Sequence, residues 1–147
     1  MKKIALIIIL LINFTGTAQR VKKTYLDSLA RKIHFKGKSP VFFEGSLDAM
    51  KEIASYINKK DGYYLIECHT SSEGKEEDSQ ILTDKIAGMV QRIFVNLGVN
   101  SSKIVSMGKG ELYPCCNSKT RATRYLNRRI EIKQITEEEI KNLKSKK

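Results

Sequence analysis

The stretch that decides the fold reads Leu65-Ile-Glu-Cys-His-Thr-Ser-Ser-Glu-Gly-Lys-Glu-Glu-Asp78 and continues to Leu97. It predicts a short apolar strand ending at His69, a polar loop over residues 70–78, and a long amphipathic helix. A strand that leads through a loop into a helix start gathers free backbone N–H groups and side chains at one edge of a sheet. We therefore expect a ligand site at this edge.

The helix after this loop has the clearest periodicity in the chain. Its apolar residues recur every three or four positions, which places them on one stripe, and Gly98 follows directly as a stop signal. These residues are Leu82, Ile86, Met89, Val90, Ile93 and Leu97. The stripe predicts a helix with one buried face.

The flanking segments predict the remaining elements. A first strand is expected at residues 32–35, a helix with Ser46 as N-cap at residues 46–58, and further strands at 103–107 and around Ile130 and Ile132. Residues 112–126 are expected to form a loop. Thr136 and Glu139 form a capping box that predicts a short C-terminal helix. The order β-α-β-α-β-β indicates an α+β fold with two main helices packed on a small mixed sheet.

The N-terminus has the pattern of an export signal. Two lysines precede an apolar run over residues 4–14 and small residues follow, so cleavage is expected before Gln19. We divide the chain of 147 residues into a signal peptide at 1–18, a lead-in segment at 19–31, a single domain at 32–135 and a basic C-terminal helix or tail at 136–147. An uncleaved membrane anchor is the alternative for the first segment.

The chain is strongly basic, with a formal net charge of +11. An exported basic protein favours anionic surroundings such as cell-wall polymers, lipid head groups or acidic proteins, and nucleic acid is not expected as a partner. Within this basic chain the predicted loop is acidic, with Glu73, Glu76, Glu77 and Asp78. A basic cluster follows, which consists of Arg121, Arg124, Arg128 and Arg129.

Each charged group has two interpretations. The acidic loop either provides a grip for a ligand amine or is simply solvated. The arginines either face an anionic polymer or pair internally, with Arg129 on Glu131 or on the acidic loop.

Three cysteines allow one disulfide and one free thiol in an exported protein. Cys115 and Cys116 are adjacent and would form a strained ring together, so a bridge from Cys68 to one of them is the preferred pairing. Cys68 and His69 point to opposite faces of the strand and cannot act as a catalytic dyad. A zinc site made of the cysteines with His34 or His69 lacks the usual ligand spacing, so no cofactor and no metal are expected.

Several of these motifs together resemble the peptidoglycan-binding domain of OmpA-like outer-membrane proteins. The resemblance covers residues 32–134 and is carried by Thr70 after a strand, Gly108-Lys-Gly-Glu111, Pro114 and Asn127-Arg-Arg-Ile-Glu131 in that order. It implies a non-catalytic module, at the periplasmic side of the outer membrane, that binds the cell-wall stem peptide.

At the ligand site this chain departs from the family pattern. The resemblance implies that an aspartate after the threonine and an arginine in the second helix grip diaminopimelate, but here these positions hold Ser71 and Ile86. The family's loop asparagine falls on Ser79. Thr70, Asn127 and Arg128 match the pattern and remain candidate ligand contacts. Wall binding is therefore expected to be weakened or altered.

Two other functions remain open. One is a protein-interaction module of an outer-membrane or periplasmic complex that no longer binds peptidoglycan, and the other is a zinc- or thiol-dependent enzyme. We prefer the wall-binding module, without enzymatic activity, whose partners are peptidoglycan or envelope proteins and whose association with the outer membrane is peripheral.

Overall fold

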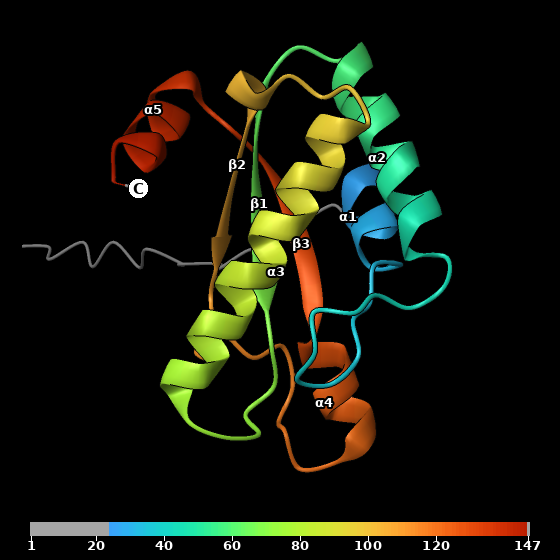
Figure 1. The fold of residues 1–147 in the computed structure, drawn as a ribbon, viewed down its shortest axis with the longest axis vertical. Coiled ribbons are helices and arrows are strands. Elements are labelled where there is room, and N and C mark those ends of the chain that lie inside the picture. The colour runs from blue at the N-terminus through green and yellow to red at the C-terminus, as the bar shows by residue number, and fades with distance from the viewer. Residues whose placement is uncertain (1–23, 147) are drawn as a thin grey trace, which may run out of the picture.

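The computed structural model describes residues 24–146, which form a three-stranded mixed sheet with helices on both faces (Figure 1). The central strand β1 (Tyr63–His69) pairs in parallel with β2 (Ile104–Gly108) and antiparallel with β3 (Arg129–Ile135). The α+β class is thus confirmed. The expected signal peptide and the first five residues of the lead-in segment, 19–23, lie outside the described residues.

Five α-helices accompany the sheet. Three of them pack against one face, and these are α1 (Tyr25–Ala30), α2 (Ser46–Lys59) and α3 (Glu76–Asn96) (Figure 1). The short helix α4 (Arg121–Asn127) leads into β3, and α5 (Glu137–Ser145) packs on the other face. A single turn of 3-10 helix (Ser101–Lys103) precedes β2. None of the helices in the described part of the chain is long and apolar enough to cross a membrane.

The alternation of β1 divides the molecule into two sides. Ile66 and Cys68 point into the main core with the helices α1, α2 and α3, and both are fully buried. Leu65 points the other way and joins a small second cluster with Val105 and Ile140 of α5. Because successive strand residues face opposite sides, the polar Glu67 and His69 share the side of Leu65.

The start of α2 differs from the prediction. Gly45, with φ of 84°, is the N-cap, and Ser46 is the first helical residue. The Ser46 hydroxyl instead accepts a hydrogen bond from the His34 backbone N–H and donates one to the His34 carbonyl, both at 3.2 Å. Ser46 therefore fixes the segment before α2 to the helix rather than capping it.

Two further expectations need correction. The predicted strand at residues 32–35 is reduced to an isolated bridge between Phe35 and Phe42, because this segment pairs only with its own return and not with the sheet. The predicted loop at 112–126 contains the start of α4, which Thr120 and Thr123 begin as a capping box. The C-terminal capping box at Thr136 is confirmed, and it starts α5.

Candidate functional site

The loop between β1 and α3 forms one wall of a cavity of about 250 Å³. Thr70 and Ser71 end the strand side and are buried, and Ser79 and Leu82 of α3 close the other side. Glu73 and Asp78 supply its carboxylates, and Lys38 and Lys75 supply its ammonium groups. The edge predicted from the sequence thus carries a hollow with both signs of charge.

Glu73 is the most highly connected side chain of this loop. One carboxylate oxygen, Oε2, accepts hydrogen bonds from the Ser71 hydroxyl at 2.7 Å and from Arg128 Nη1 at 3.0 Å. The other, Oε1, lies 2.9 Å from Nε of Arg124. The Ser71 hydrogen bond and the charges of Arg128 and Arg124 lower the pKa of Glu73, against the opposing effect of partial burial. Glu73 is therefore held ionised at neutral pH.

The two arginines lie far from this loop in the sequence, at the short helix before β3. Arg124 lies on α4, and Arg128 follows its last residue, so the short helix positions both guanidinium groups across from Glu73. Beyond Glu73 they line a broader hollow of about 890 Å³. Its remaining lining residues are basic, aromatic, small or aliphatic, namely Lys36, Gly37, Lys38, Phe43, Arg121, Ala122, Tyr125 and Leu126.

The remaining predicted site residues have structural contacts. The Ser79 hydroxyl donates to Glu111 Oε2 at 2.6 Å, and the Thr70 N–H donates to the Gly110 carbonyl. Both contacts join the site loop to the turn after β2. Ile86 is fully buried and packs in the main core.

Asn127 is also fully buried, and its side-chain amide holds the loop before α4. Its Oδ1 accepts hydrogen bonds from the backbone N–H groups of Cys115 and Cys116, and its Nδ2 donates to the Cys116 carbonyl and the Ser118 hydroxyl. Asn127 thus anchors residues 115–118 to the last residue of α4, directly before Arg128 in the sequence.

All three cysteines are free thiols in the structure. Cys68 is fully buried in the main core, as its strand position predicts, and it forms no bridge to the later pair. Cys115 and Cys116 lie at the surface with their sulfur atoms 3.1 Å apart. Burial raises the pKa of Cys68 far above its usual value, so this thiol stays protonated.

Sequence reasoning left the pairing of the charged groups open, and the structure gives it. Arg129 pairs with Glu131, with Nε 2.7 Å from Oε1, as one of the two interpretations proposed. Arg128 and Arg124 pair with the acidic loop through Glu73. The sequence signal that could have selected Glu73 is its place two residues after Ser71, where its carboxylate reaches the serine hydroxyl.

Comparison with known proteins agrees with this architecture. A family model described as the OmpA family matches residues 22–128. Outer membrane porin F of Pseudomonas fluorescens is 38% identical over 63 residues, which are 43% of this chain and 19% of the porin. Outer membrane protein A of Bordetella avium is 35% identical over 67 residues, 46% of this chain and 34% of that protein. The chain thus matches only a minor part of the length of either relative.

Two solved structures share the fold. The peptidoglycan-associated lipoprotein of Burkholderia pseudomallei aligns with a TM-score of 0.69 at 21% identity, over 78% of this chain and 98% of that chain. The C-terminal domain of Helicobacter pylori MotB aligns with a TM-score of 0.65 at 19% identity, over 77% and 93%. With the family match covering most of the chain, the conclusion is that this protein belongs to the OmpA family.

Proposed function

We propose that this chain is a non-catalytic module of the bacterial cell envelope, exported to the periplasm, that binds peptidoglycan through the hollow between the loop at residues 70–79 and α4. The observation that carries the proposal is the pairing of Glu73 with Arg128, with 3.0 Å between Oε2 and Nη1. Glu73 lines both cavities and Arg128 lines the larger one. An amino acid such as diaminopimelate offers an ammonium group for the carboxylate and a carboxylate for the guanidinium.

This grip is altered from the family pattern. Ser71 and Ile86 occupy the positions of the gripping aspartate and arginine, and Ile86 is in the core. The Ser71 hydroxyl donates to Glu73, so the Glu73 carboxylate lies one hydrogen bond away from the position of the missing aspartate. Arg128, whose side chain is 12% exposed, supplies a guanidinium from the β3 side of the hollow instead of from α3.

We expect this altered site to bind its ligand weakly, because its charged groups already form ion pairs with each other in the free protein. In the free protein Glu73 contacts both Arg124 and Arg128, and a zwitterionic ligand must exchange these bonds for its own. A charge-assisted hydrogen bond contributes about 1.5 to 3 kcal/mol, but an exchange returns only the difference between the old and new partners. We therefore expect binding that falls steeply with salt, since both partners are partly solvent-exposed.

The test is retention of the mature protein on purified peptidoglycan sacculi at moderate salt, followed by titration with free diaminopimelate. Glu73→Gln and Arg128→Ala should each reduce retention about tenfold, since each removes one charged partner of the ligand. Glu52→Gln and Arg92→Ala are matched controls. Each removes the same charge as its counterpart at the site from an exposed helical position, Glu52 on α2 and Arg92 on α3, and both should bind as the unaltered protein does.

Two results would contradict the proposal. Absence of retention of the unaltered protein at moderate salt would rule out wall binding. Equal losses of retention for Arg92→Ala and Arg128→Ala would show that the general basic charge of the chain, and not the site, attracts it to peptidoglycan.

A further inference from the structure

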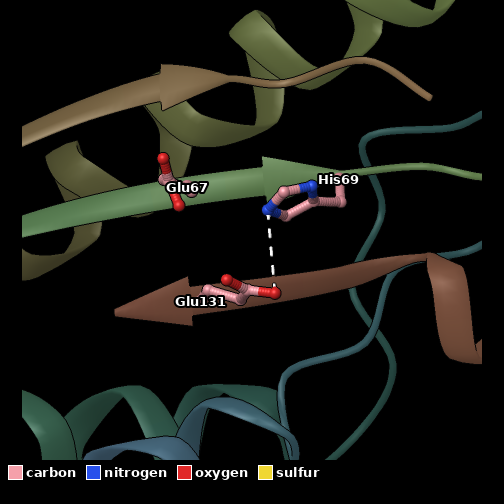
Figure 2. A group of neighbouring side chains, drawn as sticks. All are labelled: Glu67, His69 and Glu131. Carbon is pink, nitrogen blue, oxygen red and sulfur yellow. Dashed lines mark ion pairs between the residues drawn. The ribbon is translucent and has the colours of Figure 1, made fainter. Parts of the chain in front are cut away.

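A second polar cluster lies on the face of the sheet opposite to the main core (Figure 2). Glu67 on β1 and Glu131 on β3 are direct partners in the antiparallel register, so their carboxylates face each other across one pair of strands. His69 follows two residues after Glu67 on the same face, and its imidazole points toward Glu131 in Figure 2. Two like charges directly opposite on a sheet destabilise it unless a cation lies between them.

His69 is the unsatisfied member of the cluster. Its side chain is 4% exposed, and within the described residues neither ring nitrogen has a hydrogen-bond partner. The nearest carboxylate oxygen, Glu131 Oε1, is 3.9 Å from Nε2, beyond hydrogen-bonding distance. The ring of Tyr113 lies nearly perpendicular to the imidazole, with 6.5 Å between the ring centroids. A buried polar group without a partner is destabilising, so the presence of one here points to a function.

Both carboxylates form ion pairs with lysine or arginine side chains, and these pairs provide no hydrogen bond to the imidazole of His69. Lys133 bridges Glu67 and Glu131, Lys109 lies 3.2 Å from Glu67, and Arg129 holds Glu131. Of these cations Lys133 occupies the gap between the two carboxylates, and its side chain is 51% exposed. It can therefore move into solvent at a small cost.

We propose that Glu67, His69 and Glu131 form a binding site for a divalent transition metal of the zinc class, in which the metal replaces the ammonium of Lys133. One ligand atom from each residue lies within 4.8 Å of the other two. One imidazole and two carboxylates, with a water in the fourth position, suit zinc. The ion would satisfy both facing carboxylates, as Lys133 does, and also the imidazole nitrogen that Lys133 leaves without a partner.

Geometry and charge define what binding requires. Ligand atoms of a tetrahedral zinc site with bonds near 2.0 Å are about 3.3 Å apart, so the cluster must contract. Glu131, whose side chain is 31% exposed, has the room to move inward. Lys109 and Arg129 each contact an Oε1 atom, of Glu67 and Glu131 respectively, whereas Lys133 contacts the Oε2 atoms of both. Lys109 and Arg129 therefore orient the two carboxylates and also weaken their attraction for the metal. The competition from Lys133 makes this a site of moderate affinity.

The experiment is calorimetric titration of the full chain with zinc alone, in a Cys115→Ser, Cys116→Ser background that removes the surface thiols as competing ligands. We expect saturable binding of one zinc per chain. Lys133→Met, which keeps an unbranched side chain only one atom shorter but removes the ammonium, should raise the affinity at least tenfold. His69→Phe should lower it at least a hundredfold. Absorption of bound cobalt in the visible range should report the same changes.

The zinc affinities of the variants distinguish a specific metal site from an adventitious ion. The proposal is overturned if Lys133→Met takes up no zinc, or if His69→Phe binds zinc as the background protein does, which would indicate an adventitious ion only. Circular dichroism of each variant checks its fold, and Glu131→Gln serves as a second ligand variant at a half-exposed position, expected to lose at least tenfold. Wall retention measured in parallel separates this site from the proposed function, because the metal site does not use Glu73 or Arg128.

Discussion

Two groups of charges in this molecule share a plan but differ in depth. Around Glu73, two arginines hold one carboxylate at the mouth of open hollows. Around Glu67 and Glu131, three cations hold two carboxylates, and beside them lies the buried His69, whose ring nitrogens have no hydrogen-bond partner among the described residues. In both groups the cations outnumber the carboxylates. The buried Glu67 and His69 make the second group matter more for stability, whereas each group can exchange a partner for a ligand only through its exposed members.

The largest expected difference concerns acid. Burial and the charge of Arg129 lower the pKa of His69 to about 4, against the opposing charges of Glu131 and Glu67, whereas the unfolded chain has a pKa near 6.5. Between these values the unfolded state binds the extra proton, so stability falls as the pH falls from about 6.5 to about 4. At 1.36 kcal/mol per pKa unit the loss is about 3 kcal/mol.

This loss can be measured by urea denaturation at pH 7 and pH 4. His69→Phe should remove about 3 kcal/mol of the difference between the two pH values, because it has no titrating group. Glu73→Gln should remove much less of that difference, because the lowered pKa of Glu73 keeps its carboxylate ionised in the folded protein over most of this pH range. An equal pH effect in the unaltered protein and in His69→Phe would show that His69 is not the group responsible.

The next expected difference is in the free energy of unfolding, when the same Glu→Gln substitution is made in the buried group and in the exposed group. Glu67 is 4% exposed and holds Lys133 and Lys109, so Glu67→Gln should cost about 2 kcal/mol in free energy of unfolding after allowance for the exposed lysines. Glu73→Gln should cost less than about 1 kcal/mol, because its ion pairs are partly solvated. Chemical denaturation of the two variants tests the ranking, and a larger cost at Glu73 would reverse the comparison.

A smaller effect separates the two arginines of the open group. Arg128→Ala removes the proposed carboxylate partner, whereas Arg124→Ala removes a competitor for Glu73 and should raise the affinity for diaminopimelate about threefold. An exposed ion pair contributes up to about 1 kcal/mol, which sets this limit. Titration of both variants with diaminopimelate checks it, and equal losses in both would argue against competition by Arg124.

The smallest expected effect is that of Ser71→Ala. Its hydroxyl donates to Glu73 and accepts from Arg128 at 3.2 Å, so its loss removes two bonds that the remaining pair can partly replace. We expect a cost of about 0.5 to 1 kcal/mol in the free energy of unfolding and less than a threefold change in retention on sacculi. A tenfold loss of retention would assign Ser71 a direct ligand contact.

Local patterns predicted the main elements well. The periodicity of residues 82–97 is that of α3, and the alternation after Tyr63 places Cys68 in the core and His69 on the opposite face. The strand predicted around Ile33 is wrong. The same alternation of buried and more exposed residues occurs here in an irregular segment that packs against α2. Helix α4 was missed because its capping pair, Thr120 and Thr123, is not the common Ser/Thr-to-Glu form.

The sites depend on contacts that no local pattern contains. Glu73 meets Arg128 across 55 residues, and Glu67 meets Lys133 across 66. The position at which α4 ends decides which acidic residue of the loop pairs with an arginine. The facing of Glu67 and Glu131 follows from strand register, which the sequence alone leaves undetermined.

The depth of Cys68 has a practical consequence. Its thiol is fully buried and protonated, whereas Cys115 and Cys116 lie at the surface. An alkylating reagent should therefore modify two sulfur atoms at once and reach the third only when the core strand separates from its helices. The rate of that third modification gives a direct measure of how often the whole domain opens, without any label being introduced.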